Sequence, residues 1–485
     1  MFKNLNNLEE HEFILGIDIG DSTSSIAFFD SKKNSPQVLD ISGGYGKSTM
    51  STAFQFINET GDWIFGEYAL LNHNDNNPSV SYPITNALKG GLTNLSVFVE
   101  QFINHIISTH PKAIPIAIVV AVPYNIQKED ELKSAFNKFK DIIMFVPYSQ
   151  AVFAYKYFKK SPINETVLLL DYGARAFRAS LFKIDKTIKQ LSYYENVSLG
   201  INSLNSTLID YFTNIYKVHF NKTEKELTSN ETLNLRNFIY QNKDQIFIKQ
   251  NKALKLYMNF CLPPLLCTLS EIDQKNIISP YKKELTNTLN SVLSSWEVDA
   301  SDIETVLLTG GGFEMAWVKD LIENIFPDSN IDKYKNPKAV ASLGACIIGA
   351  QKLKLVSESI VLEYIKPLGY DIGLYATIGK EKVFVPIIKK EAYPGYKHTC
   401  NIIVSQNTNN PFTIDLLKKT TDGELSLISV FDIDPIQRPP LTTVLSVSLT
   451  LTSDNLIAYI EDKGFGQLFP KTNFNRQYKI NLPKE

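Results

Sequence analysis

Two segments of the chain repeat one pattern of hydrophobic and polar positions. Residues 13–20 form an apolar run that ends in Asp-Ile-Gly, and a short polar stretch leads from it into a second apolar run at 26–29. Residues 166–173 repeat the pattern, end in Asp-Tyr-Gly and lead into residues 177–182. Each pair of runs predicts a β-hairpin whose first strand is buried. The hairpins lie about 150 residues apart, which indicates an internal duplication.

Other strands and helices alternate with these hairpins. Residues 305–312 predict a buried strand that enters a turn of three glycines, and apolar spacing predicts a helix at 315–325. Residues 116–122 form another buried strand, and a one-sided apolar stripe predicts a helix over 281–296. Alternating strands and helices are typical of an α/β domain.

Beyond residue 365 the apolar residues follow a period of two, which predicts strands separated by turn residues. The segments with this pattern are 383–388, 401–404, 412–417, 444–451 and 456–460. Their spacing is typical of a β-sandwich, and no segment after residue 355 has clear helical spacing. The expected parts are an α/β domain at 1–353, with halves of about 1–165 and 166–353, a linker at 354–365 and an all-β domain at 366–485.

Composition and charge exclude several classes of protein. Of the 485 residues, 44% are hydrophobic and 21% are charged, which excludes a disordered chain. The net charge of -2 provides no basic field for nucleic acid. The longest apolar run, residues 113–122, is too short for a membrane span, and the first ten residues do not resemble a signal peptide. The four cysteines and six histidines lack metal-site spacing, so we expect a reduced, cytoplasmic protein without a zinc site.

The glycine turns suit phosphate binding, because phosphate oxygens must approach backbone N–H groups that a side chain would cover. The acids that precede the turns, Asp18 and Asp171, can orient a magnesium ion and its water shell. For a single glycine turn, the alternative interpretation is an ordinary tight turn of the kind found in any α/β protein. Three such turns in this order favour a nucleotide site between two half-domains.

The order and spacing of these motifs resemble those of the seventy-kilodalton heat-shock chaperones, members of the actin-like ATPase superfamily. Residues 16–20 and 170–173 are similar to the two phosphate motifs of that family, and residues 308–311 are similar to its adenosine motif. The other similar segments are 119–124, 151–155, 199–209, 336–345, 366–369 and 431–433. The resemblance covers nearly the whole chain. It implies a duplicated, ribonuclease H-like nucleotide-binding domain followed by a β-sandwich.

The resemblance also implies a set of residues that would bind ATP or ADP with magnesium. Catalytic roles would fall on Asp18, Asp171 and Lys89. The residues that would contact the nucleotide are Gly20, Ser22, Thr23, Gly173, Gly200, Gly310, Gly311 and Gly344.

The chain departs from the family pattern around the phosphates. In the second phosphate loop, Ala176 replaces a threonine, Arg178 replaces an acid, and Ala174 and Arg175 replace two glycines. These changes remove a hydroxyl group, reverse a charge and add bulk beside the backbone. Because phosphoryl transfer depends on positioning and electrostatic stabilisation, they predict a hydrolysis-deficient protein.

Further departures lie elsewhere in the predicted cleft. Asp21 replaces a threonine in the first loop, where its carboxylate would repel a polyphosphate. The glutamate expected before the next helix falls on Pro147 or Tyr148, and the arginine expected to pack on the base falls on Glu314.

Two interpretations of the cleft follow from these departures. In the first, Arg175 or Arg178 forms an ion pair with Asp18, Asp21 or Asp171 in the space of the metal and phosphate. In the alternative, the arginines point to solvent and the cleft still binds ATP.

For the β domain, the resemblance implies binding of extended peptides, with Phe412, Ile414 and Thr377 lining the site. The alternative is that Phe412 is an ordinary residue of the strand core. The family's helical lid has no counterpart in the sequence, so we expect rapid peptide exchange. The expected partners are unfolded or extended protein segments and a co-chaperone.

We therefore expect a chaperone-like peptide-binding protein with a degenerate ATP cleft. An active ATP-dependent chaperone and an actin-like scaffold or filament protein are the alternatives. The β domain argues against a filament protein, which does not need one. The low arginine count, five, beside abundant Lys and Asn is typical of AT-rich bacterial genomes.

Overall fold

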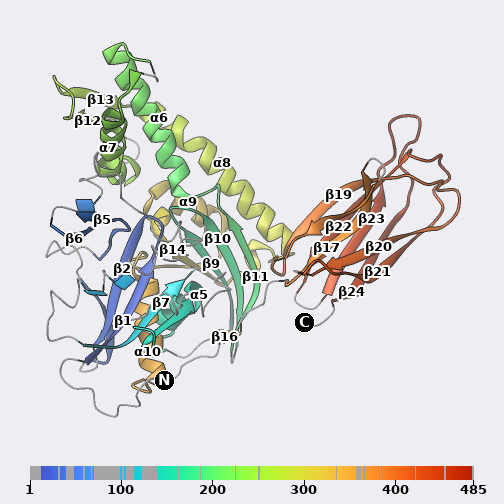
Figure 1. Cartoon of the computed structure of the whole chain (residues 1–485), viewed down its shortest axis with the longest axis horizontal. Helices are drawn as coiled ribbons and strands as arrows, with labels where there is room; N and C mark the ends of the chain where they lie inside the picture. The colour runs from blue at the N-terminus through green and yellow to red at the C-terminus, as the bar shows by residue number, and fades with distance from the viewer. Residues whose placement is uncertain are drawn as a thin grey trace.

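A computed structural model of the chain describes residues 12–30, 33–39, 48–57, 60–66, 68–69, 99–100, 103–104, 114–122, 139–160, 164–185, 187–223, 226–248, 252–334, 336–356, 362–363, 368–378, 381–390, 392–420, 422–452 and 455–482. Lys89 and most of the predicted linker lie outside these residues. Figure 1 shows an α/β part and, beside it, a separate all-β domain.

The α/β part contains two sheets that repeat one strand order. The first sheet runs β3 (Ser35–Val38), β2 (Thr23–Asp30), β1 (Glu12–Ile19), β7 (Ile114–Val122) and β8 (Ile143–Pro147), with β4 (Met50–Ser51) also paired to β2. The second runs β11 (Ile188–Asn196), β10 (Phe177–Ile184), β9 (Glu165–Tyr172), β14 (Thr305–Thr309) and β15 (Asn330–Lys333), with β16 (Leu362–Glu363) added beside β11. In each sheet three antiparallel strands are followed by two parallel ones. Both predicted hairpins are confirmed.

Two helices, α5 (Tyr148–Lys156) and α10 (Val340–Lys352), pack against these sheets through apolar side chains. They cross closely because α10 carries Gly344 at the contact. A Cβ at Gly344 would lie 1.6 Å from the carbonyl oxygen of Ala151, so no larger residue fits there without moving backbone.

The other described helices and two short hairpins lie mostly toward one end of the two sheets, at the top of Figure 1. They are α6 (Ile201–Phe220), α7 (Ser229–Ile248), α8 (Glu271–Ser295), α9 (Ala316–Ile325), the hairpin β12 (Leu254–Met258) to β13 (Leu265–Leu269) and the hairpin β5 (Phe54–Ile57) to β6 (Asp62–Phe65). The helix predicted at 315–325 is confirmed as α9. Among the described helices, none has the length and apolar character needed to cross a membrane.

Helix α8 begins ten residues before its predicted start at residue 281. Ser270 and Asp273 form a capping box, in which each side chain accepts a hydrogen bond from the other residue's backbone N–H at 3.1 Å. Pro280 lies inside the helix. The predicted start was wrong because an internal proline usually ends a helix, whereas here the cap sets the beginning.

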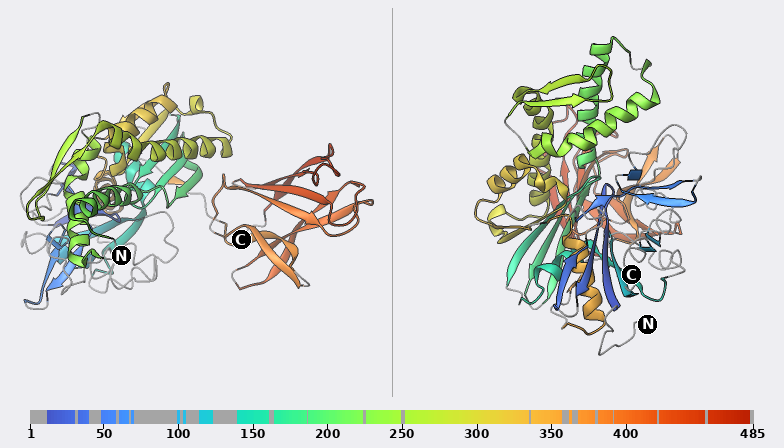
Figure 2. Two further views of the ribbon diagram at one scale, coloured as in Figure 1. Left: turned by 90° about the horizontal axis from the view of Figure 1, so that it is seen from above. Right: turned by 90° about the vertical axis from the view of Figure 1, so that its left-hand side faces the viewer.

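The β domain is a sandwich of two four-stranded sheets. One sheet is β18 (Glu381–Ile388), β17 (Asp371–Ile378), β20 (Phe412–Lys419) and β21 (Leu425–Ile433). The other is β19 (Lys397–Val404), β22 (Thr443–Leu451), β23 (Asn455–Asp462) and β24 (Asn475–Asn481). The two sheets share one apolar core, and all five strands predicted in this region are confirmed. Figure 2 shows the sandwich from two further sides.

Candidate functional site

A cavity of about 180 Å³ lies between the two sheets of the α/β part, and residues of all three predicted glycine turns line it. The first two turns have equivalent geometry. Gly20 N donates to Thr23 O at 3.1 Å in the β1–β2 turn, and Gly173 N donates to Ala176 O at 3.0 Å in the β9–β10 turn. The repeated sequence pattern therefore encodes a repeated turn at one cleft.

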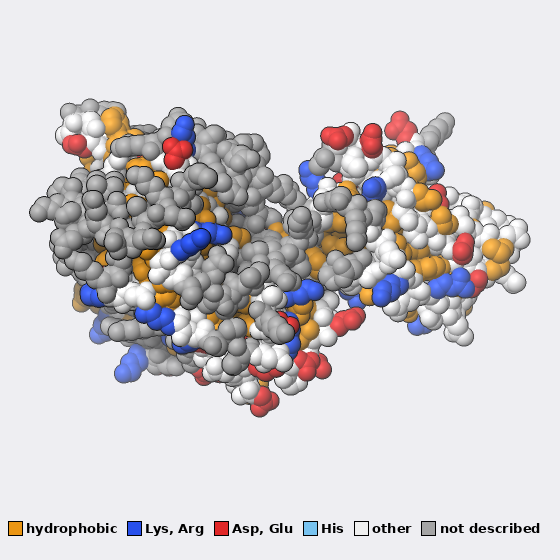
Figure 3. All heavy atoms as spheres, turned by 90° about the horizontal axis from the view of Figure 1, so that it is seen from below, with side chains coloured by type: hydrophobic (Ala, Val, Ile, Leu, Met, Phe, Trp, Pro, Cys, Tyr) orange, Lys and Arg blue, Asp and Glu red, His pale blue; other side chains and the backbone are white. Residues whose placement is uncertain are grey.

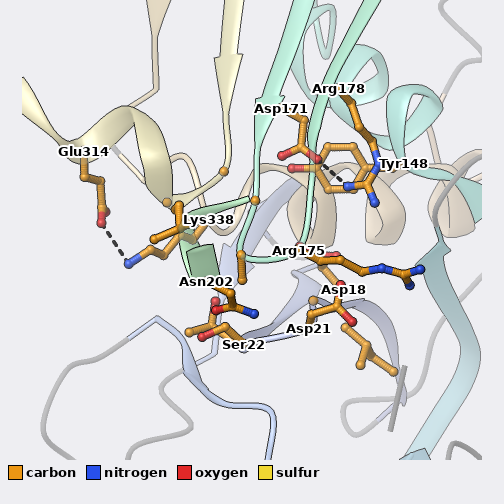
Figure 4. Close-up of a pocket in the computed structure, with 18 of the residues that line it drawn as sticks. Asp18, Asp21, Ser22, Tyr148, Asp171, Arg175, Arg178, Asn202, Glu314 and Lys338 are labelled. Atoms are coloured by element: carbon orange, nitrogen blue, oxygen red, sulfur yellow. Dashed lines mark hydrogen bonds and ion pairs between the residues drawn. The ribbon is translucent and has the colours of Figure 1, made fainter. Parts of the chain in front are cut away.

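A row of three charged side chains crosses the second sheet beside this cavity. Asp171 on β9, Arg178 on β10 and Glu195 on β11 are directly opposite one another in the antiparallel register. Nη1 of Arg178 lies 3.0 Å from Oδ2 of Asp171, and Nη2 lies 2.8 Å from Oε1 of Glu195. Figure 4 shows the guanidinium beside Asp171 within the cleft. Of the ion pairs predicted between Arg175 or Arg178 and Asp18, Asp21 or Asp171, the one between Arg178 and Asp171 is confirmed.

Burial and this charged row together set the charge state of the cleft. Burial lowers the pKa of Arg178, but Asp171 and Glu195 outweigh burial and raise it, so the guanidinium stays charged. On β1, burial and then the charge of Asp171 raise the pKa of Asp18 to about 8, and Arg178 offsets only part of this rise. At neutral pH, with no cation in the cleft, Asp18 is therefore mostly protonated.

The raised pKa of Asp18 predicts that Asp18→Asn stabilises the protein at alkaline pH. The folded-state pKa of about 8 lies above the unfolded value of about 4, so the folded wild type binds an extra proton between these values and loses stability as pH rises. Asparagine does not titrate. The variant's advantage in free energy of unfolding should grow by up to about 1.4 kcal/mol per pH unit across this window. Urea unfolding at about pH 5 and about pH 8.5 measures it, and an advantage that is equal at both values contradicts the raised pKa.

The glutamate expected from the family pattern falls on Pro147 or Tyr148. Pro147 ends β8, and Tyr148 begins α5 and lines the cavity. Burial, followed by the charges of Asp171 and Asp18, raises the pKa of the phenol, whose hydroxyl is hydrogen-bonded to Thr309. The phenol stays neutral, so it does not replace the general base that a carboxylate would provide.

The N-terminus of α6 is closed by the β9–β10 turn. Ile201 N donates to Gly173 O at 3.1 Å, and Asn202 N donates to Ala174 O at 2.8 Å. Gly200 permits this contact, because a Cβ there would lie 2.4 Å from Ala174 O. The first amides of a helix are favourable anion-binding groups. Here these two amides donate to the protein's own carbonyl groups.

A second ion pair lies on the other side of the cleft (Figure 4), where Lys338 Nζ is 2.8 Å from Glu314 Oε2. Gly310, which follows β14, has φ of +87°. A Cβ on this residue would lie 2.7 Å from Asp171 Oδ1. A Cβ on Gly311 would lie 2.8 Å from Cε of Lys338. The glycine turn thus packs directly on charged side chains, and Glu314 pairs with a lysine.

The other residues expected at the site fall into separate groups. Those that also line the cavity are Asp21, Ser22, Thr23 and Arg175. Ala176 is fully buried at the turn. Gly344, expected among the nucleotide contacts, lies instead at the crossing of α5 and α10, where a Cβ has no room. Lys89 lies outside the described residues. Among the residues described, no group of three His, Cys, Asp or Glu side chains is placed to hold a metal ion.

The three residues expected to bind peptide do not form one surface in the β domain. Phe412 is 9% exposed and belongs to the sandwich core, and Ile414 packs against the same core. Thr377 is exposed on β17, three residues after the core residue Leu374, so it points to the opposite face of the sheet. The prediction that all three residues line a single site was therefore wrong. The structure bears out the alternative that Phe412 is a core residue.

Residues in or beside the cleft that were not expected from the sequence include Glu195, Tyr193 and Lys338. The register of the β10–β11 hairpin is the signal that would have placed Glu195 opposite Arg178 and Tyr193 opposite Ser180. Lys338 meets Glu314 only through the tertiary fold, for which the pattern of a single segment contains no signal.

Comparison with known proteins identifies the family. A family model described as Hsp70 protein matches residues 148–456, which is more than half of the chain. The chain is 22% identical over 329 residues to heat shock cognate 70 kDa protein 3 of Dictyostelium discoideum, an alignment that covers 65% of this chain and 50% of that protein. It is 21% identical over 412 residues to chaperone protein DnaK of Mycoplasmopsis agalactiae, covering 80% of this chain and 67% of that protein.

A third relative is a ribosome-associated molecular chaperone of Saccharomyces cerevisiae, which is 22% identical over 294 residues, or 58% of this chain and 46% of that protein. The chain thus spans about half the length of several curated relatives that it matches. The α/β part with its cleft comes first in the chain and the β-sandwich second, as the order of the motifs predicted. The family model covers most residues of the cleft and most of the sandwich. The chain belongs to the Hsp70 protein family.

Proposed function

We propose that this chain is a chaperone-like, peptide-binding member of its family whose nucleotide cleft is degenerate and does not hydrolyse ATP. The observation that carries the proposal is the position of Arg178, which pairs with Asp171 and Glu195 at the cleft. The family pattern has an acid at this position and metal and phosphate nearby. An arginine instead supplies the counter-charge for Asp171 from within the protein.

The cleft residues do not fit a magnesium triphosphate. Asp171 is engaged by Arg178, and Ala176 supplies no hydroxyl group. The first two amides of α6 donate to the β9–β10 turn. Because phosphoryl transfer needs several positioned charges and donors at once, we infer that too few remain here for catalysis.

We also propose that the α/β part is a duplicated, ribonuclease H-like domain of the actin-like class. The identical strand order of the two sheets supports a duplication. The matching hydrogen bonds of the two glycine turns support it independently, because both link a glycine amide to the carbonyl three residues later.

For the peptide, we favour the edge of the sandwich along β18, an outer strand of its sheet. Val383 and Val385 are each 37% exposed there, although their β17 partners Ala376 and Leu374 place them on the core side of the sheet. An edge strand offers unpaired backbone groups and neighbouring apolar side chains to an extended peptide. Figure 3 shows one face of the molecule, on which hydrophobic side chains reach the surface of the β domain between charged ones.

A labelled extended apolar peptide should therefore bind with the same affinity with and without magnesium ATP. Fluorescence anisotropy measures the Kd, and Val385→Asp should weaken binding by about tenfold because it places a charge on the apolar edge. Val430→Asp is the matched control, since Val430 is 39% exposed on β21, the other outer strand. Equal effects of the two substitutions contradict the β18 site. A Kd that changes with magnesium ATP contradicts the degenerate cleft.

One observation favours the second candidate, an active ATP-dependent chaperone. The Oδ1 atom of Asn205 and the Oγ atom of Ser149 are buried at the cavity and lack a hydrogen-bond partner among the described residues. A bound nucleotide is one source of such a partner. Calorimetric titration of the full chain with magnesium ATP distinguishes the two candidates.

The proposal includes unfolded or extended protein segments as clients, a co-chaperone as a further partner and a reduced, cytoplasmic setting. Support for the setting comes from the four cysteines, all of which are free.

A further inference from the structure

Strand β21 is an outer strand of the sandwich, and its face turned away from the core is apolar. Phe431 belongs to the core, so its neighbour Val430 points outward. On β20 the core residue is Leu416, so Leu417 points outward, and Leu427 points outward with it as its pairing partner. The outward residues of β21 are Leu425, Leu427 and Val430, which are 40%, 57% and 39% exposed.

These side chains end an apolar band that crosses the outward face of the whole sheet. Leu417 on β20 pairs with Leu427 on one side and with Gly373 of β17 on the other. A Cβ on Gly373 would lie 2.8 Å from Cζ of Phe384, so the ring of this β18 residue lies over the glycine. The band therefore runs from Phe384 through Leu417 to Leu427, where it stops at an outer edge. Such an edge leaves apolar surface that another strand can cover.

The edge of β21 also lacks a feature that would oppose pairing with a second copy of the chain. When an edge strand pairs with its own copy in antiparallel register, a central charge meets a like charge. The outer strands β18 and β24 carry Lys382 and Lys479, and β19 begins with Lys397. By contrast, β21 has no charged residue and no proline from Leu425 to Phe431.

The two ends of β21 carry groups of opposite charge that suit this antiparallel arrangement. At the C-terminal end, Nη1 of Arg476 on β24 donates to Asp432 O at 2.9 Å, which places a half-exposed guanidinium beside the edge. Glu424 is exposed immediately before the strand. If two β21 strands pair antiparallel about Ile428, Glu424 of each copy lies opposite Asp432 of the other, and therefore near Arg476 of that copy.

We propose that the protein self-associates through β21, with two copies paired antiparallel about a twofold axis near Ile428. The pairing joins the four-stranded sheets of two sandwiches edge to edge and continues the apolar band from one copy into the next. A twofold contact of this kind uses the same surface on both copies, so the assembly closes at a dimer. The proposal goes beyond peptide binding and is independent of it, because β18 is the opposite edge of the sheet.

Sedimentation velocity of the full chain between about 1 and 100 μM tests the self-association. The wild type should pass from monomer to dimer, and Leu427→Lys should weaken the dimer by at least about tenfold, because two lysines then approach across the axis. Ile403→Lys is the matched control, since Ile403 is also 57% exposed and lies on β19, an outer strand of the other sheet. It should sediment as the wild type does. A wild type that stays monomeric, or equal losses for the two variants, would overturn the proposal.

A charge exchange tests the twofold arrangement itself. Leu427→Lys and Leu427→Glu should each be monomeric alone, whereas an equimolar mixture should dimerise because opposite charges then meet across the axis. Circular dichroism confirms that both variants are folded. A mixture that stays monomeric would overturn the twofold pairing.

Hydrogen exchange of the wild type distinguishes strand pairing from other contacts. The amides of residues 425–430 should exchange more slowly when the concentration is raised through the dimer transition, because a paired edge buries them in hydrogen bonds. Unchanged exchange in this segment would overturn the pairing of β21. Loss of labelled-peptide binding in Leu427→Lys, without self-association of the wild type, would assign this edge to a peptide instead.

Discussion

Arg438→Met is expected to lower the free energy of unfolding of the β domain by about 3–5 kcal/mol, because it leaves a buried carboxylate without its cation. The side chains of Arg438 and Asp462 are 5% and 0% exposed. Nη1 and Nη2 of Arg438 donate to Oδ1 and Oδ2 of Asp462 at 2.8 and 2.7 Å, and Nη2 also donates to Pro470 O at 2.5 Å. Urea unfolding of the full chain, followed by circular dichroism, measures the loss as an earlier transition of the sandwich.

Arg476→Met is the matched control for this prediction. Arg476 pairs with Asp434 at 2.7 Å in the same domain, but their side chains are 39% and 62% exposed, and exposed pairs contribute little. The unfolding curve of this variant should overlay that of the wild type. Equal losses for the two arginine variants would contradict the assignment of the buried pair as a main stabilising contact.

The buried pair should also give the β domain a characteristic response to acid. Burial raises the pKa of Asp462, but hydrogen bonds from Arg438 and from the backbone of Gly464 and Thr472 outweigh burial and lower it. The stabilisation is therefore complete above the unfolded pKa of about 4 and is lost as pH falls through the folded value. The difference in free energy of unfolding between the wild type and Arg438→Met should therefore become smaller below about pH 4.

The two hairpins and the pair between Arg178 and Asp171 could be predicted from local sequence, for a physical reason. Both depend on residues close together in the chain, where a buried apolar run, a glycine turn and an antiparallel return set the register. Asp171 and Arg178 are seven positions apart and lie opposite each other in β9 and β10. Glu195 was missed because its position depends on the connection between β10 and β11, which the apolar pattern did not locate.

Features that depend on long-range packing could not be predicted in the same way. Gly344 matched a family motif near the nucleotide, yet its lack of a side chain serves the approach of α10 to Ala151. Thr377 and Phe412 were assigned to one site by their position in the motif order. The alternation of side chains along a strand places them on different faces. A motif identifies a segment, whereas the direction of each side chain follows from strand register.

The second large effect concerns the affinity of the cleft for nucleotide. A cleft that binds magnesium ATP needs free anionic ligands for the metal and free donors for the phosphates. In this chain Arg178 engages Asp171, and Lys338 is paired with Glu314. The loss should amount to several orders of magnitude in affinity, since each 1.4 kcal/mol of missing interaction is about tenfold.

Isothermal titration calorimetry of the full chain with magnesium ATP at neutral pH tests this most directly, combined with a phosphate-release assay on the same sample. Peptide binding by that sample shows that the protein is folded and competent. We predict no saturable heat up to about 1 mM nucleotide and no phosphate release above the buffer rate. Saturable, magnesium-dependent binding with a Kd of about 10 μM or lower, accompanied by phosphate release, would contradict the account and identify the chain as an active ATPase.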